Sequence, residues 1–241
     1  NKRRRRPGRK RACVKSGKDS MMKSENQMPR LVVFDLDGVI LNSEPLHEAA
    51  KRRIFAKYGI PAGLDLSWSV GRPNSELWGP MVERYRLPCS AKELERMQYE
   101  QILSLIRERN VPLSDGLPEL LRWLRQENVK IGLASSSDRF YVDRILEYFA
   151  LKPWFDAVKG GDEAAHKKPA PDIYTAVLKA AGIPAGHAVA VEDTKAGIEA
   201  ASAAGLRCVG YRNPTSGMQK LDRADWIVET LSAIPGLLKP A

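Results

Sequence analysis

Cysteine and long apolar runs are both scarce in this sequence. The 241 residues include three cysteines, Cys13, Cys89 and Cys208, and no Cys-x-x-Cys pair. A thiolate metal site is therefore not expected, and a reducing intracellular setting fits best. No apolar run approaches the roughly 18 residues that a membrane-spanning helix needs. We therefore expect a cytoplasmic globular protein with no membrane partner.

Most of the sequence also lacks an excess of either charge. The net charge of the chain is +10, but residues 1–30 alone hold 12 Lys or Arg against 2 Asp or Glu. The remaining residues hold 27 side chains of each sign, so they have no bulk attraction for nucleic acid or anionic membranes. We expect no nucleic-acid partner outside residues 1–30.

Residues 1–30 form a basic tail in which like charges repel and few apolar side chains can be buried. Such a composition predicts disorder. One interpretation is an extension outside the folded domain, which would then start near Met28. The other is a nucleic-acid-binding arm or a nuclear address, since basic runs serve both roles. The first interpretation is favoured.

Short apolar runs alternate with helical patterns from residue 31 onward. The first run, LVVF at 31–34, is rich in β-branched residues and lies between charged ones, which is typical of a parallel strand buried on both faces. Further strands are expected at 130–134, 157–158, 188–191, 207–210 and 226–228, and helices at 116–127, 140–149, 172–181 and 194–204. This alternation predicts an α/β fold with a doubly wound parallel sheet.

Residues 44–112 interrupt the alternation and contain no convincing strand. Amphipathic helices are expected at 47–58, 75–85 and 91–109, joined by turns that contain Gly and Pro. The simplest account is a helical unit of residues 44–112 inserted into a core formed by residues 31–43 and 113–241. Because ligands bind at the carboxyl ends of the strands in open α/β sheets, the inserted unit would lie over the site as a lid.

Two carboxylates follow the first expected strand. Asp35 and Asp37 are two residues apart, so they point to the same side of an extended segment. Adjacent carboxylates repel unless a cation or a proton lies between them, and Mg²⁺ prefers carboxylate oxygens. The alternative is an acid-rich turn in which Gly38 supplies a positive φ.

A second acidic pair, Glu192 and Asp193, follows the expected strand at 188–191. It has two interpretations. The pair could bind the same cation, or Asp193 and Thr194 could cap the helix that follows.

A serine run and a lysine complete the candidate site. Ser135, in the run Ser135-Ser136-Ser137, could donate to a phosphate oxygen beside a helix N-terminus, or the run could be a helix cap. Lys168 is fixed by neighbouring prolines and could neutralise a phosphate, or it could be a solvated lysine like Lys167. Carboxylates, a hydroxyl and a lysine after successive strands are what phosphoryl transfer requires.

These motifs resemble those of the haloacid-dehalogenase-like superfamily, in its β-phosphoglucomutase and phosphoglycolate-phosphatase-like branch. The resemblance lies in FDLDGVI at 34–40, LASSS at 133–137, KPAPD at 168–172 and VEDTKAG at 191–197. It implies a Rossmann-like core with a helical cap inserted after the first motif.

By motif position, the resemblance implies that Asp35 is a nucleophile that forms an aspartyl-phosphate and also binds Mg²⁺. Asp37 would act as general acid and base, and its backbone carbonyl would contact the metal. Ser135 and Ser136 would bind the phosphoryl group, and Lys168 would orient it. The metal site would be completed by Glu192 and Asp193.

The expected cap is where this sequence departs from the mutase. The mutase grips a distal phosphate with a Gly-x-Ser-Arg segment, whereas here the nearest arginine, Arg72, is displaced. Asp138-Arg139 replaces a Lys-Asn pair, and an acidic residue there would repel a second phosphate. Arg72, Trp68 and Trp78 are candidates for lining the substrate pocket.

The resemblance also implies that His47 reaches the catalytic region from the cap hinge; the alternative is a partly buried helix histidine. We expect a Mg²⁺-dependent phosphatase, monomeric, whose partner is a small phosphorylated metabolite such as a sugar phosphate. One alternative is a sugar-phosphate mutase like β-phosphoglucomutase. An alternative of another class is a nucleic-acid-binding protein that acts through the basic tail.

Overall fold

The computed structural model describes residues 27–66 and 74–239. Within these residues, parallel strands form a six-stranded sheet in the order β3-β2-β1-β4-β5-β6. The strands are β1 (Leu31–Phe34), β2 (Lys130–Ala134), β3 (Ala157–Lys159), β4 (Ala188–Glu192), β5 (Arg207–Tyr211) and β6 (Trp226–Val228). The predicted α/β class and doubly wound parallel sheet are confirmed, and each strand lies within one residue of its predicted bounds.

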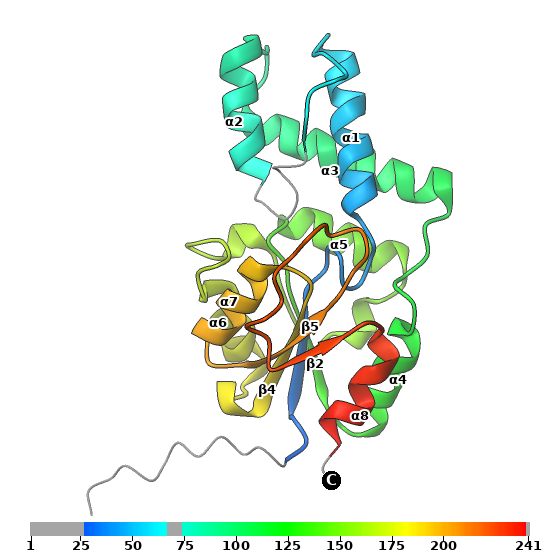
Figure 1. Ribbon diagram of the computed structural model, residues 1–241, viewed down its shortest axis with the longest axis vertical. Coiled ribbons are helices and arrows are strands. Elements are labelled where there is room, and N and C mark those ends of the chain that lie inside the picture. The colour runs from blue at the N-terminus through cyan, green and yellow to red at the C-terminus, as the bar shows by residue number, and fades with distance from the viewer. Residues whose placement is uncertain (1–26, 67–73, 240–241) are drawn as a thin grey trace, which may run out of the picture.

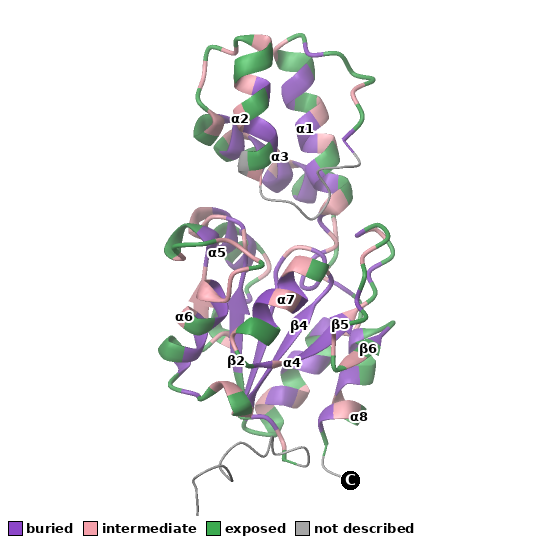
Figure 2. Cartoon of the chain, turned by 60° about the vertical axis from the view of Figure 1, so that its left-hand side comes forward, coloured by how far each residue is buried: buried purple, intermediate pink, exposed green. Residues whose placement is uncertain are grey.

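The central strand β1 pairs with both β2 and β4, and helices cover both of its faces. Val32 and Phe34 pack into one apolar cluster, whereas Leu31 and Val33 pack into the other. The first cluster contains side chains of α4 (Leu117–Gln126), α5 (Arg139–Tyr148) and α8 (Ile234–Leu238), and the second those of α6 (Asp172–Ala181) and α7 (Lys195–Ala203). Figure 2 shows the buried strands between these helices. The unbroken apolar run at 31–34 follows from this two-sided cover.

Three further helices, which we call the cap helices, stand together at one end of the molecule (Figure 1). They are α1 (Glu44–Lys57), α2 (Asn74–Tyr85) and α3 (Ala91–Arg109). They share an apolar cluster of their own that includes Ile54, Phe55 and Trp78. Across residues 43–66 and 74–112, which the structure describes, no strand interrupts them. The chain enters this group directly after β1 and its first turn, at the carboxyl end of the sheet.

Helix α1 begins three residues earlier than the sequence pattern predicts. It starts at Glu44 and has Pro45 in its first turn, where a missing backbone N–H breaks no helical bond. His47 therefore lies within the first turn of the helix rather than at its start. Lys51 follows one turn later on the same face, because residues four apart are neighbours on a helix.

No helix within residues 27–66 and 74–239 is both long and apolar enough to cross a membrane. The prediction of a disordered basic tail concerns residues that lie outside the described ones, apart from residues 27–30, which lead into β1. Helix α8 is not predicted by the sequence pattern, because five residues with a proline give too short a period to detect.

Candidate active site

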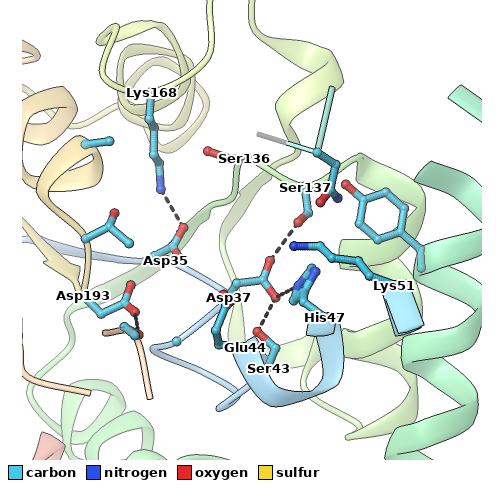
Figure 3. A pocket seen from close by; sticks show the side chains of 16 residues that line it. Asp35, Asp37, Ser43, Glu44, His47, Lys51, Ser136, Ser137, Lys168 and Asp193 are labelled. Carbon is cyan, nitrogen blue, oxygen red and sulfur yellow. Dashed lines mark hydrogen bonds and ion pairs between the residues drawn. The ribbon is translucent and has the colours of Figure 1, made fainter. Parts of the chain in front are cut away.

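A pocket lies at the carboxyl ends of β1, β2 and β4, between the sheet and the cap helices (Figure 3). Its core wall includes Asp35, Asp37, Ser136, Ser137, Lys168 and Asp193, and its cap wall includes His47, Lys51, Asn74 and Tyr99. All four motifs of the sequence therefore contribute to one site, although they are spread over about 160 residues of chain.

Lys168 contacts three groups of the core wall at once. Its Nζ donates to Asp35 Oδ1 and to Glu192 Oε1, both at 2.6 Å, and to the backbone oxygen of Ala134 at 2.9 Å. These three contacts use the three donors of an ammonium group. Burial lowers the pKa of Lys168, but the two carboxylates outweigh burial and leave the pKa above its usual value. The alternative interpretation, a solvated lysine, does not fit a side chain that is 6% exposed.

Asp35 is a buried carboxylate whose pKa is raised to about 7. Burial is the largest cause, and the negative charges of Glu192 and Asp37 add to it, while Lys168 acts in the opposite direction. A carboxylate in this state lacks enough positive charge around it. The site therefore favours the arrival of a further cation beside Asp35.

The donor set fits a divalent cation such as Mg²⁺. Asp35, Glu192 and Asp193 are all buried, and one oxygen of each lies within 4.8 Å of the others. Asp193 Oδ2 accepts a hydrogen bond from Ser216, but Asp193 Oδ1 is buried without a partner in the described structure. An unsatisfied buried carboxylate oxygen is costly, and hard cations bind through such oxygens. Burial also raises the pKa of Asp193 well above its usual value, which a cation would reverse.

Two glycines leave room for these carboxylates. Gly38 has a φ of +86°, and a Cβ there would lie 1.9 Å from Asp193 Oδ2. A Cβ at Gly197 would lie 1.9 Å from Glu192 Oε2. Any side chain at either position would displace a candidate metal ligand, which explains the glycines in the motifs at 34–40 and 191–197.

Asp37 is held by a different set of neighbours. Its Oδ1 accepts from Ser43 at 2.7 Å and from His47 Nε2 at 3.2 Å, and its Oδ2 accepts from Ser137 at 2.8 Å. Tyr141 donates to Oδ1 at 3.3 Å. Burial raises the pKa of Asp37, but the hydrogen bonds from His47, Ser43 and Ser137 outweigh it, so the pKa lies below its usual value.

A chain of hydrogen bonds runs from Asp37 into the cap helices. Trp78 Nε1 donates to Gln98 Oε1 at 2.7 Å, and an indole nitrogen can only donate. The other end of the amide, Gln98 Nε2, must then donate, and it does so to His47 Nδ1 at 2.9 Å and to Asn74 Oδ1 at 3.2 Å. His47 consequently carries a proton on Nε2, which points at Asp37.

Comparison with known proteins identifies the family. The haloacid dehalogenase-like hydrolase family matches residues 29–205. The chain belongs to this family. This haloacid dehalogenase-like hydrolase is 31% identical over 176 residues to a phosphorylated carbohydrates phosphatase of Thermotoga maritima. The match covers 73% of this chain and 81% of the relative.

Two further relatives place it in the branch that the motifs indicate. A phosphoglycolate phosphatase of Pseudomonas fluorescens is 31% identical over 236 residues, covering 90% of this chain and 83% of the relative. The crystal structure of CbbY from Rhodobacter sphaeroides in complex with phosphate superposes with a TM-score of 0.75 at 26% identity, covering 86% of this chain and 96% of that one. The resemblance read from the motifs is thus confirmed.

The structure places the predicted site residues of this haloacid dehalogenase-like hydrolase in three groups. Asp35, Asp37, His47, Ser136, Lys168 and Asp193 line the pocket. Ser135 and Glu192 lie just behind it: Ser135 is 1% exposed and accepts from the Ser137 backbone N–H at 3.0 Å, and Glu192 is fully buried beneath Lys168. Arg72 and Trp68 lie outside the described residues. The predicted roles of all these residues stay predictions.

Sequence reasoning missed several residues of the pocket and misplaced one. Trp78, predicted to line the pocket, is instead buried in the cap cluster, where it donates a hydrogen bond to Gln98 at 2.7 Å. Lys51 and Ser43 could have been found from helix spacing, since Lys51 lies one turn after His47. Gln98 and Ser216 give no local signal, because only the packing of distant segments brings them to the site.

Proposed function

We propose that this chain is a Mg²⁺-dependent phosphatase that hydrolyses a small phosphomonoester, such as a sugar phosphate, through a covalent phosphoryl group on Asp35. The observation that carries the proposal is the contrast between two carboxylates that face one pocket. Asp35 Oδ1 lies 2.6 Å from Lys168 Nζ within the acidic cluster of Glu192 and Asp193, whereas Asp37 is held by hydrogen bonds from Ser43, His47 and Ser137. Carboxylates with opposing environments are typical of sites where one group reacts and the other transfers protons.

In the first step, Asp35 attacks phosphorus, and the bond from phosphorus to the leaving oxygen breaks as the new bond forms. Lys168 holds Asp35 Oδ1 at 2.6 Å and so fixes the direction of the nucleophile. Asp37, in its protonated form, supplies the proton that the departing alkoxide needs and is left ionised for the second step. Asp35 is buried and Asp37 is half-buried, and hydrogen bonds restrict the orientation of both before the substrate arrives.

In the second step, water attacks the same phosphorus, and inorganic phosphate leaves as Asp35 is regenerated. Asp37 accepts the proton from that water. The low pKa of Asp37 in the present arrangement corresponds to the ionised base, held by Ser43, His47 and Ser137. Asp35, Glu192 and Asp193 would hold Mg²⁺, with the Asp37 backbone carbonyl beside them. When bound, the cation supplies positive charge that offsets these carboxylates and the phosphoryl oxygens.

The experiment is a measurement of inorganic phosphate release from a panel of sugar phosphates, phosphoglycolate and nucleotides. We expect release that depends on Mg²⁺ and stops on addition of a chelator. Release that is unchanged by the chelator would contradict the metal site. Absence of release from every ester would contradict the phosphatase.

The same panel separates the phosphatase from the mutase. A mutase would interconvert glucose 1-phosphate and glucose 6-phosphate in the presence of a bisphosphate primer, with little phosphate lost to water. We expect phosphate to be lost faster than the isomers exchange. The opposite ratio would move the proposal to a mutase.

A further inference from the structure

A loop outside the four sequence motifs also reaches the pocket. Residues 212–217, which we call the β5 loop, begin the connection from β5 to β6. Because β5 pairs with β4 in parallel, this loop leaves the sheet at the same edge as Asp193. Ser216 of the β5 loop lines the pocket and is 5% exposed.

The β5 loop is held against the turn that follows β1. Asn213 is buried, and its Nδ2 donates to the backbone oxygen of Gly38 at 2.7 Å. Its Oδ1 accepts from the backbone N–H of Thr215 at 2.8 Å, and the Thr215 hydroxyl is hydrogen-bonded to Asn42. The backbone N–H of Ser216 donates to the Asn213 carbonyl at 3.3 Å. These contacts set the position of Ser216 before any ligand binds.

Ser216 gives the two carboxylate oxygens of Asp193 different surroundings. Its hydroxyl donates to Asp193 Oδ2, whereas Asp193 Oδ1 is buried and has no hydrogen-bond partner among the described residues. The terminal torsion of an aspartate is broad unless a contact fixes it, so the bond to Ser216 decides which oxygen stays unpaired. A buried carboxylate oxygen without a donor is costly, and hard cations bind through such oxygens.

The donor that holds Asp193 is neutral, unlike the donor that holds Asp35. The ammonium of Lys168 binds Asp35 and offsets its charge, whereas a hydroxyl binds Asp193. Ser216 therefore restricts the orientation of the Asp193 carboxylate without cancelling the negative charge that attracts a cation. A charged donor in its place would compete with the cation for the same carboxylate.

We propose that Ser216 is a positioning residue of the divalent-cation site, which orients Asp193 so that Oδ1 is the oxygen available to the cation. Ser216 is not itself a ligand and acts through Asp193. The inference rests on the proposed Mg²⁺-dependent function and adds that the β5 loop sets the affinity of the site for the cation. Removal of a group that orients a metal ligand typically weakens metal binding by about 10- to 100-fold.

The test measures the binding of Mg²⁺ alone to the full chain by isothermal titration calorimetry, without substrate. Ser216→Ala should raise the Kd for Mg²⁺ by about 10- to 100-fold. Mg²⁺ should also raise the Tm of this variant by less than that of the wild type, because a weaker ligand stabilises the folded state less. The Mg²⁺ concentration for half-maximal phosphate release should rise with the Kd. A merely structural role would lower the Tm without metal and leave the Kd unchanged.

Ser232→Ala is the matched control, because the Ser232 hydroxyl also donates, to Thr230 at 3.0 Å, but is exposed and lies outside the pocket lining. It should keep the wild-type Kd. Ser216→Cys serves if the alanine variant does not fold, since a thiol is a weaker donor of similar shape. A Kd within about threefold of the wild type in the Ser216 variant would overturn the inference and leave the phosphatase intact. No Mg²⁺ binding by the wild type would overturn the metal site of the proposed function and this inference with it.

Discussion

The two walls of the pocket are held together by different kinds of contact. On the core wall, the ammonium of Lys168 lies 2.6 Å from the carboxylates of both Asp35 and Glu192. On the cap wall, neutral donors and acceptors of Trp78, Gln98 and His47 are joined at 2.7 and 2.9 Å. The core wall is therefore ionic and rests on strand ends, whereas the cap wall is a hydrogen-bonded chain across three helices.

The two walls hold different catalytic candidates in place. The contacts of Lys168 with Asp35, Glu192 and the Ala134 carbonyl all lie within the sheet and its loops, so the Asp35 side chain is held without the cap helices. Asp37, in contrast, contacts the cap side of the site, because it accepts hydrogen bonds from Ser43 at 2.7 Å and from His47 at 3.2 Å. We therefore expect the core wall to carry the nucleophile and the cap helices to influence Asp37 through His47.

The largest effect should come from the nucleophile. Asp35→Asn should lower kcat for every ester by at least about a thousandfold, because loss of a covalent nucleophile leaves only binding and electrostatic catalysis. Steady-state phosphate release measures it. A rate within tenfold of the wild type would show that Asp35 is not the nucleophile.

Asp37→Asn gives the matched contrast, because nitrophenolate leaves without needing a proton. With p-nitrophenyl phosphate, this variant should release a rapid burst of about one nitrophenolate per enzyme before a slow steady rate, since only the step that needs the base is blocked. Asp35→Asn should give no burst. A burst from both variants, or from neither, would erase the proposed difference between the two carboxylates.

The next largest effect should come from breaking the ionic core wall. Lys168→Met leaves Asp35 and Glu192 buried without their cation, which costs about 3–5 kcal/mol of the free energy of unfolding. The pKa of Asp35, which is already raised, then rises further in the folded state, so stability is lost as the pH rises. In urea denaturation without metal, the deficit should be larger at pH 8 than at pH 5.5.

Lys167→Met is the control for this change, because Lys167 makes none of these contacts. It should alter the free energy of unfolding by less than about 1 kcal/mol at either pH. Equal losses of stability in the two variants, or a loss in Lys168→Met that does not depend on pH, would show that the Lys168 ammonium does not stabilise the buried carboxylates of the core wall.

The same contrast explains how far the sequence could predict the site. Strand ends can be predicted, because apolar β-branched runs stop at a charge, and residues after parallel strands meet at one edge of the sheet. This logic brought Asp35, Asp37, Lys168 and Asp193 together. It could not say which serine of 135–137 faces the pocket, since that depends on how the chain turns after β2. The structure turns Ser136 and Ser137 toward the pocket and buries Ser135.

The pocket-facing residues of the cap helices were harder to predict from the sequence, for a physical reason. Helix period shows which residues share a face, but not which face meets the core, so Lys51 and Lys57 on α1 look alike in the sequence. Gln98 has a role only because Trp78 on another helix fixes the orientation of its amide. Such long-range pairings are decided by tertiary packing and leave no local pattern.

A smaller effect is expected from breaking the neutral cap wall. Gln98→Glu cannot donate to His47 Nδ1, and a carboxylate there would favour a second proton on the imidazole. We expect a loss in kcat of about tenfold and a shifted pH profile, because the charge beside Asp37 changes. Gln98→Leu should lose a similar amount of activity without that shift.

Gln101→Leu is the control, because Gln101 lies one turn further along α3 and accepts a hydrogen bond from Arg53 at 3.3 Å rather than one that leads to His47. Its pH profile should match that of the wild type. If Gln98→Glu and Gln101→Leu had the same profile, the hydrogen-bonded chain would be structural only and would not act on Asp37.

The smallest effect concerns a buried acidic side chain of the cap helices, Glu95. Glu95 on α3 is 9% exposed and accepts a hydrogen bond from Tyr99 at 3.1 Å. Burial raises its pKa, with Lys167 opposing and Asp138 adding to the rise. Because the folded pKa is the higher one, Glu95 lowers stability as the pH rises from its ordinary value through the raised value. Glu95→Gln should therefore raise Tm by up to about 2–4 °C at pH 8 and leave it unchanged at pH 4. Glu100→Gln is the control, because Glu100 is exposed on the same helix, and it should leave Tm unchanged at both pH values. An equal gain in Tm for Glu95→Gln at pH 4 and pH 8 would show that the ionisation of Glu95 is not what lowers stability.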